Sequence, residues 1–353
     1  DGIISYRRFF SINGLAGVRQ EDESVFDATH ATLRKLVREG LIDGVRVDHP
    51  DGLTDPFGYL TRLRELVGHD AWLIVEKILA ADEPLDPRLD IDGTTGYDAL
   101  REFDGVFVNP DAAGQLGDTA YRYSGARWDQ PAVEVAERAL KARVAEEELA
   151  AEVRRLARAV RHDNLSPAGA AVTDAELAEV LVALVARMPV YRADYRSLSR
   201  VTSAVIAQLA KSPRGCNRAA LDLVASALAA HGEAAHRFAQ VCGAVMAKGV
   251  EDTLFYRACR LVALQEVGGA PGRFGVSTSE FHLLQDERAQ LWPRTMTTLT
   301  THDTKRSEDT RARMLEIAEV PGEFDQLVEE VFALTPPPDT ATGLFLLHNL
   351  LGA

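Results

Sequence analysis

Residues 41–50 read Leu41-Ile42-Asp43-Gly44-Val45-Arg46-Val47-Asp48-His49-Pro50, and this stretch decides the fold prediction. Two valines alternate with polar neighbours and a proline ends the run, which is the pattern of a short strand. Helices are predicted on both sides of it, over residues 24–39 and from Pro56 to Val67, the second with proline in its first turn. The stretch is therefore predicted to be a strand enclosed by two helices.

A second strand is predicted at Ala71–Glu76, which is a continuous apolar run up to its glutamate. Such runs are typical of strands buried on both faces of a sheet. A further helix is predicted to begin after Gly93, and this alternation predicts an α/β fold with a parallel sheet and crossover helices. Asp48 and Glu76 follow the two strands, at the strand ends where parallel α/β folds carry their sites.

The rest of the chain is predicted to be helical first and then to return to the α/β architecture. Residues 133–161 are rich in Ala, Glu, Arg and Leu, and we expect a helical insertion with solvated, charged faces over 111–245. A third strand is predicted at Thr295–Thr300, where it runs into Thr301-His302-Asp303. The predicted domains are therefore 1–110, 111–245 and 246–353.

The composition argues against several classes of protein. The 353 residues carry 53 acidic and 39 basic side chains, a formal charge of −14, which disfavours a protein that coats nucleic acids. No apolar run approaches the roughly 20 residues of a membrane helix, and no secretory signal is visible. Three separated cysteines and no metal-ligand spacing predict a reduced, cytoplasmic protein without a metal or cofactor. The abrupt ends are expected for a piece of a longer protein, or for a processed or trimmed chain.

Three carboxylates at predicted strand ends, Asp48, Glu76 and Asp303, are the candidate catalytic groups. Retaining glycoside chemistry needs a carboxylate nucleophile and, about 5 Å away, a second carboxyl group that donates and then accepts a proton. Arg46 lies on the same side of the strand as Asp48, where a guanidinium would keep that carboxylate ionised. His302 is a neutral donor suited to sugar hydroxyls. Each carboxylate taken alone also fits a helix cap or a surface acid.

Several strings then resemble a known family. Gly44–His49 resembles the nucleophile motif of the α-amylase superfamily of glycoside hydrolases, Ile74–Lys77 its acid/base strand and Thr301–Asp303 its third-acid motif. Longer strings narrow the resemblance to the maltooligosyltrehalose synthase family of glucosylmutases: Tyr6–Phe10, Asp48–Leu53, Glu76–Leu79, Gly93–Asp98, Lys248–Thr253 and Thr301–Asp309. The resemblance is poor through the helical insertion, where Val190-Tyr191-Arg192 is followed by Ala193-Asp194 in place of the expected threonine.

The resemblance implies a fold and a reaction. The fold would be a partial (β/α)8 TIM barrel with its first strands missing and a mainly α-helical insertion, because the superfamily's strand-end Asp with a following Asn-His lies upstream of Tyr6 in the family order. The reaction would rearrange the reducing-end α-1,4 bond of a maltooligosaccharide into an α,α-1,1 bond. A trehalose-releasing hydrolase is the implied functional partner, and neither nucleic acid nor membrane is implied.

By the matched motifs, Asp48 is the nucleophile, Glu76 the acid and base, and Asp303 the group that stabilises the oxocarbenium-like transition state. Further substrate contacts are expected at Arg46, His49, Lys77, His302, Lys248, Glu251, Asp252 and Tyr256. The last four are candidates for a closed cleft end that retains the released glucose, but they also fit the start of a helix. A related α-glucan hydrolase or transglycosylase, and an inactive glucan-binding fragment, are the alternative interpretations.

Overall fold

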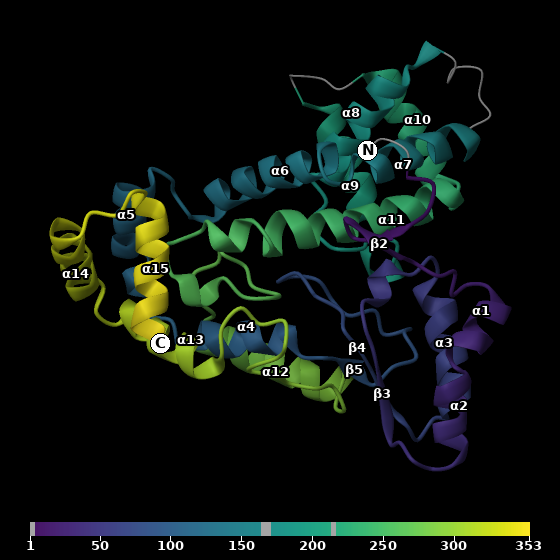
Figure 1. Ribbon diagram of the computed structural model, residues 1–353, viewed down its shortest axis with the longest axis horizontal. Coiled ribbons are helices and arrows are strands. Elements are labelled where there is room, and N and C mark those ends of the chain that lie inside the picture. Colours follow the sequence, from purple (N-terminus) through teal and green to yellow (C-terminus); the bar gives the residue numbers. More distant parts are fainter. Residues whose placement is uncertain (1–3, 164–170, 213–216) are drawn as a thin grey trace. The chain divides into compact units, whose positions relative to one another are not determined.

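The computed structural model describes residues 4–163, 171–212 and 217–353, which form a mixed α/β protein that is mostly helical (Figure 1). The chain divides into two compact units, each assembled from separate stretches of sequence. The first unit comprises residues 1–77, 83–93 and 138–249, and the second comprises residues 78–82, 94–137 and 250–353. At this coarse level the α/β prediction is confirmed, while the three predicted domains stay a prediction.

The first unit is built on the parallel strands β3 (Gly44–Val47) and β4 (Trp72–Val75), which pair along their whole length. The next strand of the sheet is β5 (Gly93–Thr94), beside β4. The three apolar residues that follow Trp72 in β4 are buried, as the unbroken apolar run predicts. Position 44 requires glycine, because a Cβ there would lie 2.5 Å from the carbonyl oxygen of Trp72.

Three helices flank these strands in the sequence: α1 (Glu23–Thr29), α2 (Ala31–Arg38) and α3 (Pro56–Val67). Asp55 caps α3 by accepting a backbone N–H of its first turn at 2.9 Å. The single helix predicted before β3 is interrupted at His30, whose ring lies in the core and contacts the hydroxyl of a tyrosine on α3 at 2.9 Å. His30 is the C-cap of α1 and the N-cap of α2.

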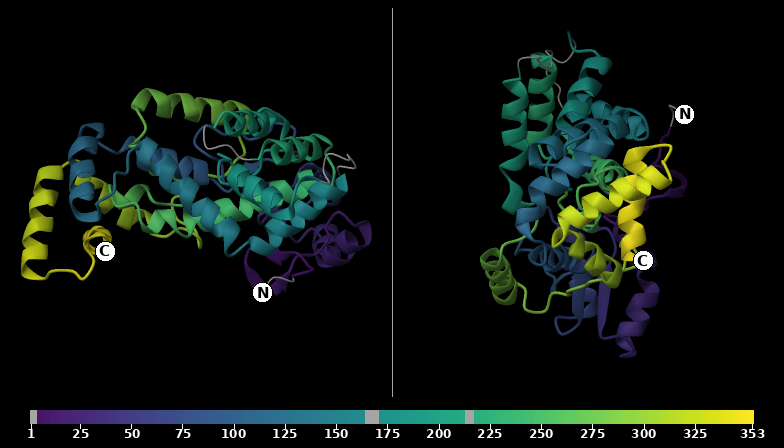
Figure 2. Two further views of the ribbon diagram at one scale, coloured as in Figure 1. Left: turned by 90° about the horizontal axis from the view of Figure 1, so that it is seen from above. Right: turned by 90° about the vertical axis from the view of Figure 1, so that its left-hand side faces the viewer.

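The unit also contains a short antiparallel hairpin, β1 (Arg8–Phe9) and β2 (Ile12–Ala16), and a helical part. Helices α7, α8, α10 and α11 pack against one another, and the views in Figures 1 and 2 show them together. These helices confirm the helical prediction for this stretch: α7 (Ala150–Asp163), α8 (Asp174–Val185), α9 (Val201–Ala210), α10 (Arg218–Ala229) and α11 (Glu233–Met246). Helix α6 (Gln130–Glu146) contains the sequence boundary between the two units.

The second unit is helical. Helix α13 packs against α15, and α15 also packs against α5 (Figure 2). Its helices are α4 (Tyr97–Val106), α5 (Ala113–Ser124), α12 (Thr278–Leu291), α13 (Glu308–Leu315), α14 (Pro321–Leu334) and α15 (Thr340–Gly352). Helices α12, α13 and α15 each begin after a side-chain cap, from Ser277, Ser307 and Asp339 respectively.

One predicted element of this unit is wrong. Residues Thr295–Thr300 are a loop and not a strand: the N–H of Met296 donates to the carbonyl of Thr94 at 3.2 Å, but no ladder continues from there. The hydroxyl of Thr298 instead bonds the carbonyl of Thr300 within the loop, which is how threonine competes with a sheet. Residues 253–266 are irregular chain with short 3-10 turns.

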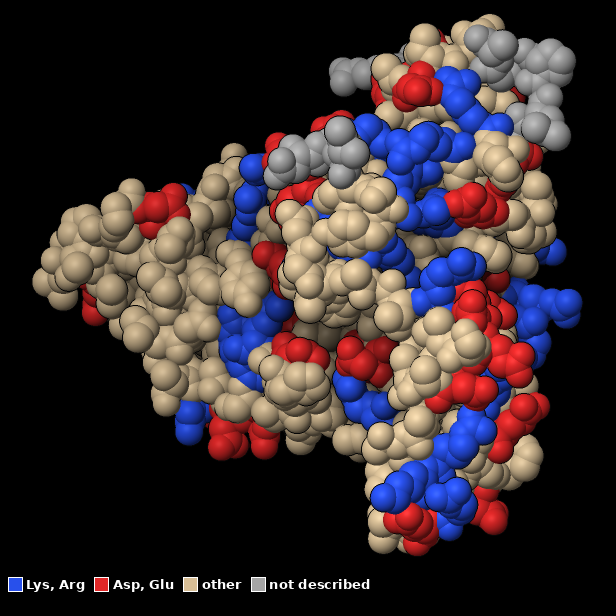
Figure 3. All heavy atoms as spheres, turned by 45° about the vertical axis from the view of Figure 1, so that its right-hand side comes forward, with Lys and Arg blue, Asp and Glu red and all other residues tan. Residues whose placement is uncertain are grey.

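The surface of the second unit has an apolar part. Large apolar side chains of α14 and α15 are exposed, among them Leu334, Leu346 and Leu350, and Figure 3 shows few charges over this end of the unit. Among the described residues no helix has the length and apolar character needed to cross a bilayer. Cys242 and Cys259 are buried free thiols, and the third cysteine, Cys216, lies outside the described residues.

Candidate active site

Asp48 and Glu76 lie at the same edge of the first unit's sheet. Strands β3 and β4 end at paired residues, and the N–H of Glu76 continues the ladder by donating to the carbonyl of Val47 at 2.8 Å. The N–H of His49 then donates to Oε2 of Glu76 at 3.0 Å. The backbone next to one candidate carboxylate therefore orients the other.

Arg46 contacts Asp48 as the strand pattern predicts. Its Nη1 donates to Oδ1 of Asp48 at 2.8 Å, and the Asp48 side chain is 62% exposed. The ion pair is open to solvent, so its direct contribution to stability is small. The geometry leaves the Asp48 carboxylate accessible to a ligand while the guanidinium restrains its direction.

An aromatic group, formed by Phe9, Phe10 and His49, lies beside this edge. The centroid of the His49 ring lies 5.0 Å from that of Phe10 and 6.3 Å from that of Phe9. His49 has a left-handed backbone with φ of 44°, a conformation that costs energy in a non-glycine residue and is held here by the surrounding contacts. Burial, together with the charge of Arg7, lowers the pKa of His49 and so favours the neutral imidazole, although Asp51 opposes the shift.

A cavity within the first unit is lined by this aromatic group together with Arg7 and Gln240. Burial lowers the pKa of Arg7 to about 10, and the nearby cation of Arg192 adds to the effect. Arg7 belongs to the string Tyr6–Phe10 but was not predicted as a site residue. The string shows only two neighbouring arginines, and the fold places both of them at the cavity.

Behind these side chains lies an ionic network, here called the Asp51–Lys77 cluster. It is formed by the buried residues Asp51, Lys77, Glu83, Arg192 and Tyr195 and by the exposed Asp194, which pairs with Arg192. The Nζ of Lys77 lies 2.9 Å from carboxylate oxygens of both Asp51 and Glu83. The hydroxyl of Tyr195 donates to Asp51 at 2.7 Å. Burial opposes ionisation of Asp51, but Lys77, Tyr195 and Arg192 outweigh it and lower its pKa.

Lys77, predicted to contact substrate, lies in this cluster. Its side chain is 1% exposed and contacts two carboxylates, which fixes the loop after Asp48, and its contact with substrate stays a prediction. Arg192 donates to the backbone carbonyls of Asp51 and Thr54, at 3.0 and 3.1 Å. Sequence reasoning missed Arg192 as a functional residue, although the string Val190-Tyr191-Arg192 was the available signal.

The residues predicted to close the cleft do not start a helix. They lie at the end of α11, in a π-helical turn at Ala247–Glu251 and the chain after it. Lys248, in the first unit, has its Nζ 5.4 Å from the centroid of the Phe10 ring. Tyr256, in the second unit, is half exposed and has the Nζ of Lys305 5.0 Å from its ring centroid. Glu251 and Asp252 belong to the second unit, and their role in a cleft stays a prediction.

Asp303 and His302 occupy an exposed loop of the second unit. Their side chains are 50% and 70% exposed, and they contact each other at 3.0 Å. The Thr301 hydroxyl accepts the N–H groups of Asp303 and Thr304 at 3.1 and 3.2 Å, and so shapes the turn. The meeting of Asp303 with Asp48 and Glu76 stays a prediction, since the candidates belong to different units.

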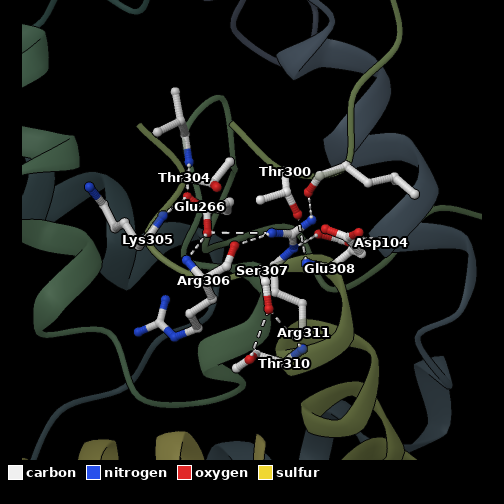
Figure 4. Close-up of polar contacts among 12 residues, drawn as sticks. Asp104, Glu266, Thr300, Thr304, Lys305, Arg306, Ser307, Glu308, Thr310 and Arg311 are labelled. Atoms are coloured by element: carbon white, nitrogen blue, oxygen red, sulfur yellow. Dashed lines mark hydrogen bonds and ion pairs between the residues drawn. The ribbon is translucent and has the colours of Figure 1, made fainter. Parts of the chain in front are cut away.

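A second buried network, here called the Glu266–Arg311 cluster and formed by Asp104, Glu266, Arg306 and Arg311, lies behind this loop (Figure 4). Arg311 is fully buried, and its Nε lies 2.7 Å from Oδ2 of Asp104. Burial raises the pKa of Asp104 to about 6 even though this guanidinium opposes the shift. Among the described residues, no group of His, Cys, Asp and Glu side chains is arranged to hold a metal ion.

No family model matches the chain. Individual known proteins are nevertheless similar to it in sequence and in fold. A curated protein of Mycobacterium tuberculosis named "Putative maltooligosyl trehalose synthase" is 48% identical over 352 residues, which is 99% of this chain and 45% of that protein. The solved maltooligosyltrehalose synthase of Arthrobacter ramosus matches with a TM-score of 0.89 and 40% identity, over 98% of this chain and 44% of that one. A hypothetical maltooligosyl trehalose synthase of Sulfolobus tokodaii matches with a TM-score of 0.78 and 28% identity, over 98% and 43%.

The mixed α/β fold and these matches define an α-amylase-like protein. Within that class, the chain belongs to the maltooligosyltrehalose synthase family. It spans about half the length of the curated relatives it matches, 45% in the case of the mycobacterial protein.

Proposed function

We propose that the protein containing this chain converts the reducing-end α-1,4 bond of maltooligosaccharides into an α,α-1,1 bond, and so forms a trehalose-ended glucan. The observation that carries the proposal is the pair of carboxylates at neighbouring parallel strand ends, Asp48 and Glu76, joined through the His49 N–H. This pair occurs within a chain that matches trehalose-forming synthases over nearly its whole length.

In the proposed mechanism Asp48 attacks the anomeric carbon and forms a glycosyl-enzyme, and Glu76 protonates the departing oxygen. Glu76 then removes the proton from the 1-hydroxyl of the released glucose, which attacks the same carbon. Two inversions give net retention, so an α bond is broken and an α bond is formed. Asp303 stabilises the positive charge that develops at the anomeric centre in both steps.

The first unit supplies what the nucleophile needs. Arg46 restrains the Asp48 carboxylate through a 2.8 Å hydrogen bond, and the neutral His49 offers a donor to sugar hydroxyls. Phe9 and Phe10 provide apolar ring faces of the kind on which sugars stack. Water must be kept from the glycosyl-enzyme, and we assign the closing of the cleft to Lys248, Glu251, Asp252 and Tyr256.

The architecture that fits this function is a partial (β/α)8 barrel. The parallel pair β3 and β4, with α3 between them in the chain, is one β-α-β unit of such a barrel. The barrel part would be 1–110 and 246–353, with 111–245 inserted. A cytoplasmic location and coupling to a trehalose-releasing hydrolase complete the proposal.

Incubation with maltopentaose tests the function, using a protein of the relatives' full length that contains this chain. Reducing ends are expected to disappear without net release of glucose. A steady rise in reducing sugar would show a hydrolase instead and would contradict the proposal. Residues 1–353 alone are expected to turn over little or no substrate, and strong activity of that piece would contradict the partial barrel.

A further inference from the structure

Glu266 binds the loop that carries Asp303 from the buried side of that loop. The carboxylate of Glu266 is 1% exposed and accepts two successive backbone N–H groups of the loop, from Lys305 at 2.7 Å and from Arg306 at 3.0 Å (Figure 4). It also accepts the N–H of Val267 at 2.9 Å. Charge-assisted bonds of this kind fix a backbone more firmly than neutral ones. The chain two residues beyond Asp303 therefore has a fixed path.

Arg311 ties together the two ends of the same loop. Its guanidinium donates to the carbonyl of Leu299 before the loop and, at 2.6 Å, to the carbonyl of Arg306 after it. The same guanidinium pairs with Asp104 on α4 at 2.7 Å and lies 3.7 Å from Glu266. Figure 4 shows this arrangement, with Arg311 rising from α13 into the loop. One planar side chain thus sets the distance between the loop's ends.

These contacts reach the backbone around Asp303 but leave its side chain free of the cluster. The Asp303 carboxylate is half exposed, and its N–H is directed by the hydroxyl of Thr301, which itself contacts Tyr97 on α4 at 2.8 Å. A rigid support under an exposed acid is the arrangement expected when the acid must meet a ligand at a defined position. A loop with only a connecting role does not need two buried ions beneath it.

We propose that Glu266 and Arg311 are positioning residues for Asp303, and that they hold residues 299–306 in the geometry that catalysis by Asp303 requires. The inference rests on the proposed function. It adds to that function two buried residues that lie outside every matched carboxylate motif. A displacement of about 1 Å at a catalytic group is enough to lower a rate about 100-fold.

The test is Glu266→Gln in the protein of full family length. Glutamine keeps one acceptor oxygen but places an NH2 group against a backbone donor, so one attachment to the loop is lost. We expect kcat per folded enzyme to fall about 10- to 100-fold, while the affinity for maltopentaose changes less than about threefold. Amide hydrogen exchange at residues 303–306 should become faster. Folding is checked by thermal unfolding, and rates are scaled to the folded fraction.

Glu280→Gln is the matched control. Glu280 belongs to the same unit and pairs with Arg273 at 2.6 Å, but it does not contact the Asp303 loop. We expect this variant to keep the wild-type kcat. If Glu266→Gln also keeps kcat within about twofold of wild type while the wild type is an active mutase, the positioning role is wrong. A wild type without mutase activity would instead refute the proposed function.

Arg311→Lys keeps the test decisive if Glu266→Gln does not fold. Lysine retains the charge beside Asp104 and Glu266 but cannot reach both loop carbonyls with a planar fork. We expect a lower kcat with an unchanged affinity for maltopentaose. Unchanged kcat in folded Arg311→Lys would overturn the proposal as well.

Discussion

In the first unit the loop after Asp48 is held through a side chain, the carboxylate of Asp51 that pairs with Lys77, and through backbone carbonyls bound by Arg192. In the second unit Glu266 and Arg311 hold the loop around Asp303 through its backbone. Both networks are mostly buried and both lie behind an exposed candidate carboxylate. The difference shows in their ionisation: surrounding cations lower the pKa of Asp51, while burial raises that of Asp104 to about 6. The two networks therefore lie behind exposed carboxylates in the same way but shift the pKa of their own acid in opposite directions.

The largest expected effect is a loss of turnover, and it distinguishes the exposed carboxylate of Asp48 from the cluster behind it. Asp48→Asn in the protein of full family length should lower turnover by at least about 1000-fold, because the amide cannot form the glycosyl-enzyme. The melting temperature should change little, since Asp48 is 62% exposed and its ion pair with Arg46 is open to solvent. Maltopentaose turnover and thermal unfolding check this, and retained turnover would remove Asp48 as the nucleophile.

A substitution within the Asp51–Lys77 cluster should lower the free energy of unfolding. Lys77→Met leaves the carboxylates of Asp51 and Glu83 buried without their shared cation, and should lower the free energy of unfolding by about 3–5 kcal/mol. Urea unfolding measures the change. Arg143→Met removes an exposed i,i+4 pair with Glu147 and is the control, with an expected change below about 0.5 kcal/mol. Equal effects of the two substitutions would show that the cluster has no special role.

The pH dependence should differ in sign between the two clusters. Asp104 has a folded pKa of about 6, above its ordinary value of 3.8, so its contribution to stability is complete below pH 3.8 and is lost as the pH rises through 6. The folded pKa of Asp51 is depressed, so its contribution is present above pH 3.8 and is lost on further acidification.

Asp104→Asn isolates the first of these dependences, that of Asp104. The stability of the variant relative to wild type should rise by up to about 3 kcal/mol between pH 4 and pH 7, because a shift of about two pKa units no longer acts in the variant. Urea unfolding at several pH values measures the difference. A difference that is constant over this range would contradict the raised pKa.

The smallest expected effect concerns the exposed ion pair of the first unit. Arg46→Ala should change the free energy of unfolding by less than about 1 kcal/mol, because both partners are solvated. Maltopentaose turnover should fall even though the free energy of unfolding changes little, since the guanidinium directs the Asp48 carboxylate. A stability loss as large as that of Lys77→Met would show that the Arg46–Asp48 pair belongs to the buried cluster.

Much of the first unit could be predicted from local pattern. The alternation in Gly44–Val47 and the apolar run in Trp72–Val75 predict two parallel strands, and their paired ends bring Asp48 and Glu76 to one edge. The strand predicted at Thr295–Thr300 failed, because β-branched composition does not supply a partner strand and the hydroxyl of Thr298 bonds within the loop. The two ion pairs of Lys77 could not be predicted either, since its motif does not show that two carboxylates surround it.

The sequence alone determined the two strands of the first unit, the order of the three candidate acids and the family, because these depend on residues that are close neighbours in the chain or on strings that can be matched directly. The tertiary structure decided what stands behind each acid. Arg192 reaches the carbonyl of Asp51 from 141 positions away, and Glu266 reaches the N–H of Arg306 from 40 positions away. Such contacts form only when distant segments fold together and buried charges must find partners, and no local pattern records them.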